Sequence, residues 1–297
     1  MGASEPPEQS MQDESESRQE SARLAPARKL LAVAGGKGGV GKSTIAVNLA
    51  LGLDRLGYRV GLLDADVHGP NVPLMLGVRR RADVSGWESI VPLAAASPPA
   101  SALPALERYG LRVMSLGLLA GEAQSILTGN AALAGVLVYG LLAQVDWGHP
   151  DLLVIDLPPG TGEPLPTLLE RVQIDGVVVV TTPQEAARLD AGRAMAAFRE
   201  ANVPILGVVE NMAYAICPRC GERIEVFHRG PAAKTIAPDA PAILARIPLD
   251  PVVSEAADTG RPVLIVEPDG PQAAAFLALA AAVAGRLGLV APPPGDE

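Results

Sequence analysis

Aromatic residues are scarce in this sequence: Phe, Trp and Tyr together account for 3% of its 297 residues. A core must therefore be built mainly from Ala, Val, Leu and Ile. At 48% hydrophobic residues the chain can bury a sizeable one. Cysteine is rarer still. The only two cysteines, Cys217 and Cys220, exclude a framework of disulfides.

Positive charge is also in short supply, with 24 Lys and Arg against 33 Asp and Glu, a net charge of −9. This balance disfavours a broad nucleic-acid-binding face, because such faces need clustered Lys and Arg. The N-terminus is polar and acidic, so no signal peptide is expected. Arg286 and two glycines interrupt the Ala-rich stretch 273–290, which favours a packed helix over a membrane span. We expect a cytoplasmic protein without membrane or nucleic-acid partners.

The order of apolar runs predicts an α/β fold. Short continuous apolar runs, typical of parallel strands covered on both faces, alternate with helix-like segments. This alternation predicts a doubly wound, mostly parallel sheet with helices on both faces. The expected strands are 30–34, 59–63, 111–115, 152–155, 177–181, 205–209 and 243–247, and the expected helices are 44–56, 131–145, 184–201 and 272–287.

One folded domain, residues 29–288, is expected between two tails. Residues 1–28 are acidic, rich in Ser and Gln, and lack apolar periodicity, which predicts a disordered tail. Residues 289–297 form a short C-terminal tail. The segment 79–108 contains Ser-Pro-Pro-Ala and Ala-Leu-Pro, which predict a long loop.

A glycine-rich segment, GGKGGVGKST at 35–44, contains the phosphate-loop template Gly-x-x-x-x-Gly-Lys-Ser between a strand and a helix. Inward-facing N–H groups would form an anion nest at the helix start. Lys42 is expected to reach the β- and γ-phosphates of ATP, and the Ser43 hydroxyl to bind Mg²⁺. A glycine-rich turn beside a lysine is the alternative, which the flanking elements disfavour. The expected nucleotide-binding residues are Gly35, Gly36, Lys37, Gly38, Gly39, Val40, Gly41, Lys42, Ser43 and Thr44.

Carboxylates follow two of the expected strands. Asp64 and Asp66 lie two residues apart and so point the same way from an extended chain, into the crevice where α/β sheets bind ligands. Asp156 ends an apolar run, a Walker B arrangement that would place it near Mg²⁺. Asp64 is expected to bind Mg²⁺ through water or to hold the loop. A turn or helix-capping role for Asp64 and Asp66 remains open.

The additional lysine of the loop, Lys37, makes it resemble the deviant Walker A loop of the ATPase family that includes MinD, ParA, the nitrogenase iron protein and Mrp-type carriers. The resemblance implies that Lys37 crosses a dimer interface to the partner's nucleotide, as an arginine finger does. A solvated loop lysine is the alternative. The resemblance also implies that Asp66 orients or deprotonates the attacking water.

Three further segments fit the same family. The sequence PPGTG at 158–162 resembles its switch II, in which the Gly160 N–H would sense the γ-phosphate. Asn211 occupies the place of an asparagine that hydrogen-bonds adenine. Asp250 lies in a segment like the one that closes over the base. Asn211 and Asp250 could instead be ordinary turn residues.

The pair Cys217 and Cys220 forms a Cys-x-x-Cys motif. Such a motif alone fits a redox pair, half a zinc knuckle or chance. Pro218 and Gly221 favour a tight knuckle, expected within 214–230. Zinc and iron–sulfur clusters usually take four ligands. Two chains related by a two-fold axis would provide four thiolates; His228 as a third ligand is the less favoured alternative.

These motifs occur in an order similar to that of the Mrp/ApbC-type iron–sulfur cluster carriers, over residues 29–287. The resemblance implies a homodimer whose paired cysteines bridge one [4Fe–4S] cluster, delivered to apo iron–sulfur proteins with ATP binding and slow hydrolysis. Two departures stand out. The 28 residues before the first strand are too few for the extra N-terminal domain of many bacterial members. Leu127–Ala131 replaces a Trp-Arg-Gly-Pro-Met-like segment.

Two other functions would suit a dimeric ATPase of this type. A zinc-bridged targeting ATPase would hold zinc tightly and offer a Met- or Leu-rich client groove, which six scattered Met support little. A MinD/ParA-like positioning ATPase would need a basic amphipathic C-terminal helix or a basic patch. The last expected helix carries only Arg286 as a basic residue, and this function leaves the thiols unexplained. The cluster carrier is the predicted function.

Overall fold

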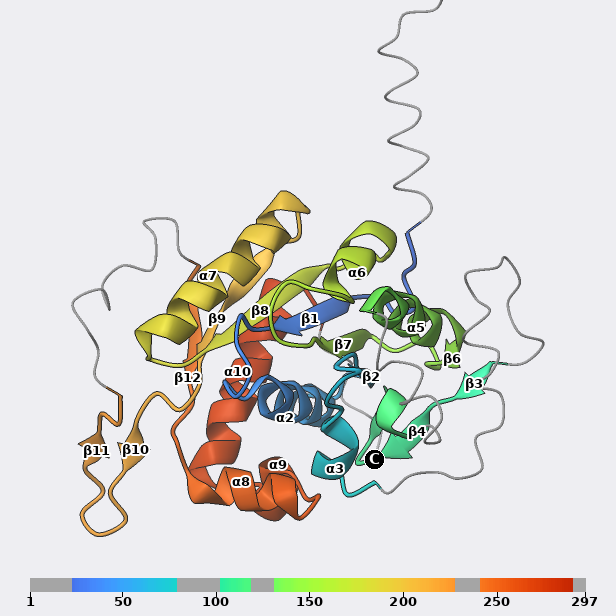
Figure 1. Ribbon diagram of the computed structural model, residues 1–297. Helices are drawn as coiled ribbons and strands as arrows, with labels where there is room; N and C mark the ends of the chain where they lie inside the picture. Colours follow the sequence, from blue (N-terminus) through green and yellow to red (C-terminus); the bar gives the residue numbers. More distant parts are fainter. Residues whose placement is uncertain (1–22, 79–101, 119–130, 228–240, 291–297) are drawn as a thin grey trace, which may run out of the picture.

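A computed structural model describes residues 23–78, 102–118, 131–227 and 241–290 (Figure 1). Its centre is an eight-stranded sheet in which every neighbouring pair is parallel except the last, where an edge strand runs antiparallel. In spatial order the strands are β12 (Ile243–Arg246), β9 (Ile205–Glu210), β8 (Gly176–Thr181), β1 (Leu30–Ala34), β7 (Leu152–Asp156), β2 (Val60–Asp64), β5 (Leu111–Ser115) and β4 (Leu106–Arg108).

Two short strand pairs stand outside this sheet. β3 (Leu103–Pro104) pairs with β6 (Val145–Asp146), and β10 (Ala215–Ile216) forms an antiparallel hairpin with β11 (Arg223–Ile224). The β10–β11 hairpin projects from the side of the molecule below β12 (Figure 1).

Helices cover both faces of the sheet, as predicted (Figure 1). One face packs against α2 (Lys42–Arg55), α8 (Pro251–Asp258), α9 (Val263–Val266) and α10 (Pro271–Arg286), with the short α3 (Val72–Met75) beside them. The other face packs against α5 (Ala131–Gln144), α6 (Leu165–Arg171) and α7 (Glu185–Glu200). None of the helices in the described ranges is long and apolar enough to span a bilayer.

The central strand β1 shows why the two layers form. Leu31 and Val33 join the cluster that contains Phe276 of α10, whereas Leu30 and Ala32 join the cluster that contains Phe198 of α7. Alternate side chains of a strand point to opposite faces, so a continuous apolar run is buried on both sides. Two of the three phenylalanines thus fill one site in each layer, Tyr58 and Trp147 add one further aromatic ring to each, and most of the other core side chains are aliphatic.

The expected strands and the four expected helices are present, with ends shifted by a residue or two. The prediction of a long loop over 79–108 is wrong at its C-terminal end, where β3 pairs with β6 and β4 pairs with β5 across a turn at Tyr109 (φ 50°) and Gly110 (φ 80°). Both central residues of this two-residue turn have positive φ, which suits the twist of a hairpin. β4 has the sequence Leu-Glu-Arg, which contains no apolar run from which a strand could be predicted. Residues 79–101 lie outside the described residues.

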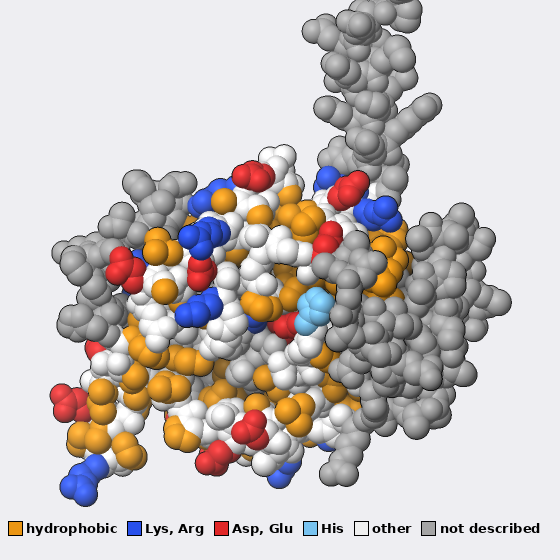
Figure 2. All heavy atoms as spheres, viewed as in Figure 1, with side chains coloured by type: hydrophobic (Ala, Val, Ile, Leu, Met, Phe, Trp, Pro, Cys, Tyr) orange, Lys and Arg blue, Asp and Glu red, His pale blue; other side chains and the backbone are white. Residues whose placement is uncertain are grey.

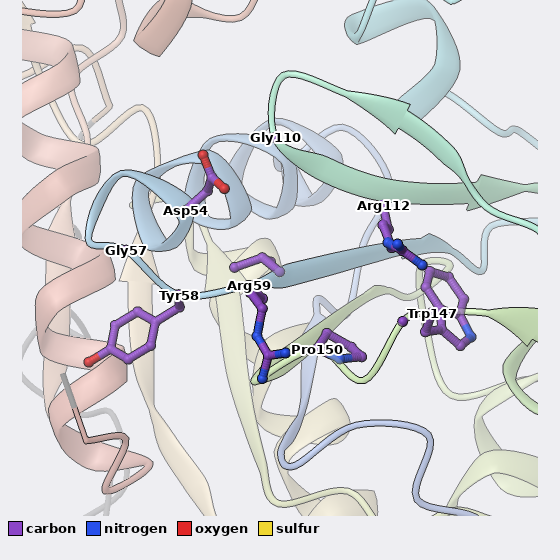
Figure 3. Close-up of a pocket in the computed structure, with 10 residues that line it drawn as sticks. Asp54, Gly57, Tyr58, Arg59, Gly110, Arg112, Trp147 and Pro150 are labelled. Carbon is purple, nitrogen blue, oxygen red and sulfur yellow. The ribbon is translucent and has the colours of Figure 1, made fainter. Parts of the chain in front are cut away.

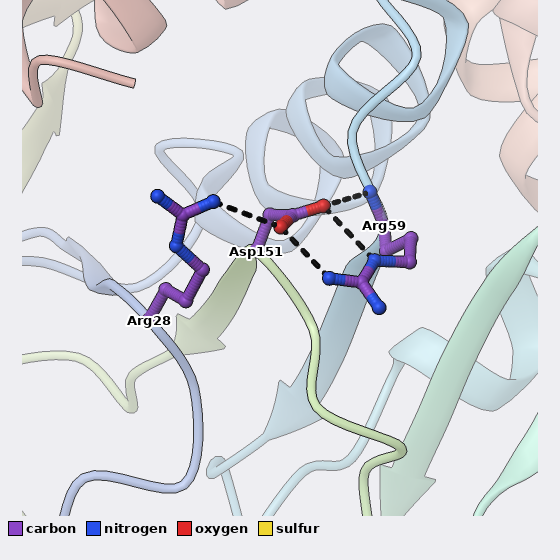
Figure 4. A network of polar contacts seen from close by, with 3 residues as sticks. All are labelled: Arg28, Arg59 and Asp151. Atoms are coloured by element: carbon purple, nitrogen blue, oxygen red, sulfur yellow. Dashed lines mark hydrogen bonds and ion pairs between the residues drawn. The ribbon is translucent and has the colours of Figure 1, made fainter. Parts of the chain in front are cut away.

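Residues 23–28, assigned to the acidic tail from the sequence, lie against the domain. The Leu24 N–H donates to the Arg171 carbonyl (3.0 Å), and the Leu24 carbonyl accepts from Gln173 (3.1 Å). Arg28 and Arg59 both bind the Asp151 carboxylate (Figure 4). The side-chain hydrogen bond from Arg59 is the main reason that the pKa of Asp151 is lowered. The rest of the expected tail, residues 1–22, is outside the described residues.

A polar cleft of about 360 Å³ lies where β2, β5 and β7 begin, so it is on the edge of the sheet opposite the phosphate loop (Figure 3). Its arginines are already engaged: Arg59 binds Asp151, and Arg112 approaches the carboxylates of Glu107 (3.5 Å) and Asp146 (3.7 Å). These ion pairs join the strand ends and the connecting segments at this edge.

Candidate nucleotide site and cysteine hairpin

The glycine-rich loop connects β1 to α2 at the carboxyl edge of the sheet. Gly39 (φ 79°) and Gly41 (φ 87°) adopt left-handed conformations that favour glycine. Gly41 is the N-cap of α2, and its carbonyl accepts the first helical hydrogen bond from Ile45 (3.0 Å). The N–H groups of Gly39, Val40 and Gly41 donate to no described residue. Free donors at a helix N-terminus are the arrangement that binds phosphate.

Close packing fixes the first two glycines of the loop. A Cβ on Gly36 would lie 2.0 Å from the backbone of Asp190 in α7, so only glycine fits there. A Cβ on Gly35 would lie 3.0 Å from the aliphatic stem of Lys42 and from the Val180 carbonyl. The loop is therefore held between α7 and the end of β8, and its small residues let Lys42 fold back over it.

Replacing Gly41 by Ala should weaken nucleotide binding by about tenfold or more. The new Cβ would lie 2.2 Å from Asn211 Nδ2, in a backbone conformation that costs a non-glycine residue about 1 kcal/mol or more. Nucleotide affinity measured by calorimetry and stability measured by urea unfolding would test this. Gly192→Ala in α7 is the matched control, because nothing lies within 4 Å of its Cβ, and it should leave affinity unchanged. If Gly41→Ala bound nucleotide as tightly as wild type does, the expected clash between its Cβ and the Asn211 side chain would be contradicted.

Lys42 and Asp156 form the charged centre of the site. Lys42 is buried, and burial lowers the pKa of its ammonium, while Asp156 and Asp66 act in the opposite direction. Burial raises the pKa of Asp156 to about 7, opposed by Ser43 and Lys42. The Ser43 hydroxyl is close enough to affect this pKa, but neither Asp156 oxygen has a hydrogen bond of good geometry to a described residue. Two buried, unpaired carboxylate oxygens beside a hydroxyl fit a divalent cation, which would offset their burial.

Asp64 holds the loop that carries Asp66. It is buried beside Asp156 on the neighbouring strand, and its carboxylate accepts from Ser115 Oγ (3.0 Å) and from the N–H groups of Asp66 (3.1 Å) and Val72 (3.2 Å). Burial, and then the charge of Asp156, raise its pKa well above the ordinary value. The structure thus favours the loop-holding role among those expected for Asp64.

Ser115 is a site residue that the sequence reasoning missed. It ends β5, and its hydroxyl binds Asp64 on the adjacent strand. Its position at the end of a predicted strand could have indicated it, because the carboxyl ends of parallel strands meet at one edge of the sheet.

Asp66 itself accepts a hydrogen bond from the Gly69 N–H (3.1 Å). Its expected role toward water stays a prediction.

The segment expected to be switch II lies against the phosphate loop. After β7 the Leu157 N–H donates to the Val33 carbonyl (3.1 Å), and the Gly160 N–H donates to the Gly35 carbonyl (3.1 Å). Gly160 has a φ of 88°. The donor expected to sense the γ-phosphate therefore binds the phosphate loop here, and sensing would require it to exchange this acceptor for another.

Asn211 and Asp250 both make local contacts. Asn211 Nδ2 donates to the Val40 carbonyl of the phosphate loop (2.9 Å). Asp250 caps α8 by accepting from the Val252 N–H (3.0 Å), and it also accepts from Gln272 Nε2 (3.0 Å). The capping bond matches the turn role kept as the alternative for Asp250. Contacts of either residue with a nucleotide base stay predictions.

Lys37 lies in the exposed part of the phosphate loop, with Gly38 and Gly39. It is exposed and makes no ion pair with any described residue. A free cation beside the phosphate loop is compatible with its expected role in a partner's site and with the solvated alternative, so that role also stays a prediction.

The two cysteines lie in the connection between β10 and β11. The Cys217 N–H donates to the Glu222 carbonyl (2.8 Å), and the Gly221 N–H donates to the Cys217 carbonyl (2.9 Å), which closes the tight knuckle. Hydrogen bonds from the backbone of Cys220, and then of Arg219, lower the pKa of the Cys217 thiol. Backbone donors that stabilise the thiolate make it a better metal ligand at neutral pH.

The hairpin presents thiols and apolar side chains together. Cys220 is exposed, and Ile216, Ile224 and Val226 are 48%, 49% and 41% exposed. Figure 2 shows hydrophobic side chains gathered on this projection. Among the described residues no three His, Cys, Asp or Glu side chains gather into a metal site. His228 lies outside the described residues, as do residues 127–130 of the atypical segment.

The chain matches known proteins over most of its length. Residues 27–284 match the model of the ParA family described as NUBPL iron-transfer P-loop NTPase. The chain belongs to this family. Its ParA/NUBPL membership agrees with the loop geometry and with the parallel sheet covered on both faces.

Individual relatives carry more specific names. An iron-sulfur cluster carrier protein of Aquifex aeolicus is 42% identical over 85% of this chain but only 66% of its own length. Another, from Pyrococcus abyssi, is 41% identical over 86% of both chains. A solved nucleotide-binding protein of Archaeoglobus fulgidus, in complex with ADP, is 32% identical with a TM-score of 0.65, covering 87% of this chain and 96% of its own.

Proposed function

We propose that this ParA/NUBPL-family protein is an ATP-binding and ATP-hydrolysing iron–sulfur cluster carrier. It acts as a homodimer in the cytoplasm, holds one [4Fe–4S] cluster between its subunits and transfers it to apo iron–sulfur proteins. The observation that carries the proposal is the combination, in one chain, of a phosphate loop with free N–H donors and a projecting knuckle with two thiols. Relatives named as cluster carriers or transfer proteins support it.

The nucleotide half of the proposal rests on the phosphate loop and the carboxylates behind it. Loop N–H groups and Lys42 would bind the phosphates, and Lys37 of the opposite subunit would approach the transferring phosphoryl group. Ser43 and Asp156 would hold Mg²⁺, which supplies charge neutralisation to the phosphates when bound. Asp66 would orient the attacking water. The burial of Lys42 and Asp156 supports strong electrostatic interactions within the site.

The cargo half rests on ligand number. A [4Fe–4S] cluster takes four thiolates, and this chain has two cysteines. Two knuckles meeting at a two-fold axis would complete the set. The exposed Ile216, Ile224 and Val226 beside the thiols would be covered at the same time, which favours association.

Metal content of anaerobically purified protein tests the proposal. After reconstitution with iron and sulfide, a dimer with about four irons and four sulfides and a broad visible absorption band is expected. Cluster transfer to an apo iron–sulfur protein would then be followed by recovery of the recipient's activity. A monomer with neither iron nor zinc would refute the carrier function and leave only a nucleotide switch.

A zinc-bridged dimer is the second candidate, because two Cys-x-x-Cys knuckles also form a four-thiolate zinc site. It predicts about one tightly bound zinc per dimer, no visible absorption, and no exchange for iron during anaerobic reconstitution. Elemental analysis separates the two.

A further inference from the structure

The Asn211 side chain contacts the phosphate loop at the Val40–Gly41 peptide. Its Nδ2 donates to the Val40 carbonyl, and the residue is 6% exposed. The Val40–Gly41 peptide is trans, so the Gly41 N–H points away from Asn211. That N–H has no acceptor among the described residues. Asn211 therefore contacts the peptide that carries one donor of the proposed anion nest.

The chain that leaves Asn211 leads directly to the cysteines. Asn211 is anchored to β8 through its N–H, which donates to the Thr181 carbonyl (2.8 Å). The Ala213 N–H donates to the Ile247 carbonyl (2.9 Å), and the Tyr214 carbonyl accepts from Leu249 (2.7 Å). β10 and Cys217 follow at once.

Tyr214 also contacts the far strand of the hairpin. The Arg223 guanidinium of β11 lies 3.8 Å from the centre of the Tyr214 ring. The connection from Asn211 to the knuckle is thus short, and backbone hydrogen bonds hold it at Asn211, Ala213 and Tyr214. Such a segment transmits a displacement better than a free loop does.

We propose that Asn211 is a positioning residue that couples occupancy of the phosphate loop to the geometry of the Cys217–Cys220 knuckle. A nucleotide that binds the Gly41 N–H reorients the Val40–Gly41 peptide, and Asn211 follows the Val40 carbonyl and moves the chain that carries β10. Coupling of this kind is reciprocal, so a ligand on the thiols changes nucleotide affinity by the same factor. The biological role of this coupling rests on the proposed function. The coupling itself can be tested with nucleotide and the two thiols alone.

The test is the rate of thiol alkylation in metal-free protein at pH 7, with and without saturating Mg-ADP or a slowly hydrolysed ATP analogue. Cys217 and Cys220 are the only cysteines, so intact mass reports the knuckle alone. We expect nucleotide to change the wild-type rate by about fivefold or more. In Asn211→Ala, and in the near-isosteric Asn211→Asp, this nucleotide effect should disappear at nucleotide concentrations shown by calorimetry to saturate each variant.

Asn202→Asp is the matched control: it makes the same change in an exposed turn after α7, where Asp tolerates the φ of 57°, and should retain the full response. An unresponsive wild type, or Asn211 variants that respond as wild type does, would overturn the coupling. A variant that merely destabilised the fold would change the basal rate without abolishing the response to saturating nucleotide. If the thiols respond but bind no iron, the carrier function fails and the coupling stands.

Discussion

Lys42→Ala should reduce ATP hydrolysis by about three orders of magnitude or more, the size of effect seen when a cation is lost from a phosphoryl-transfer site. The ammonium is buried beside Asp156 and Asp66, where charge interactions are strong. Its removal also takes away a positive charge that interacts with both carboxylates. Phosphate release under single-turnover conditions, together with nucleotide affinity, would measure the loss.

Variants of two other lysines show whether the loss of hydrolysis is specific to Lys42. Lys29→Ala removes a half-buried lysine that is paired with Asp175 (2.9 Å) just before β1, at the end of the strand away from the phosphate loop, and should leave hydrolysis unchanged. Lys37→Ala should reduce hydrolysis while nucleotide affinity of the isolated subunit stays near wild type, if Lys37 acts across a dimer interface. Lys42→Met keeps the stem that packs on Gly35 and guards against a loss caused by misfolding. Hydrolysis by both Lys42 variants within tenfold of wild type would contradict the assignment.

Cys217→Ser and Cys220→Ser should each remove the bound cluster, with iron falling from about four per dimer to near zero. Serine keeps the shape of the side chain, but its hydroxyl lacks the thiolate that iron requires. We expect each single substitution to remove nearly all of the iron, because in a two-fold symmetric dimer it removes two of the four cluster ligands. Iron content and visible absorption after anaerobic reconstitution would measure it.

Arg219→Ala is the control within the same knuckle. It retains both thiols and the backbone N–H groups that lower the pKa of Cys217, so cluster content should persist. All three variants should bind nucleotide as wild type does. A serine variant that still held a full complement of iron would show that the cluster is bound elsewhere.

Much of the scaffold was predictable from local patterns. β1, β7 and β8 are apolar on both faces, and the phosphate-loop template lies between a strand and a helix, so neither required tertiary information. The β4 strand was missed because pairing with β5 stabilises it, and its own residues carry no apolar run. Residues 23–28 contain no acidic residue and no apolar periodicity, so only the pairing of Leu24 with Val172 shows that they belong to the folded domain.

By itself the sequence determined the α/β class, the phosphate loop, the carboxylates at strand ends and the thiol pair, because each is written in consecutive or regularly spaced residues. Three contacts were decided only by the tertiary structure. The Ser115 hydroxyl donates to Asp64, Gly36 packs against α7, and Asn211 Nδ2 donates to the Val40 carbonyl. Those contacts join residues separated by 50 to 170 positions in the chain, roughly. They depend on which strands become neighbours, and no local pattern encodes that order.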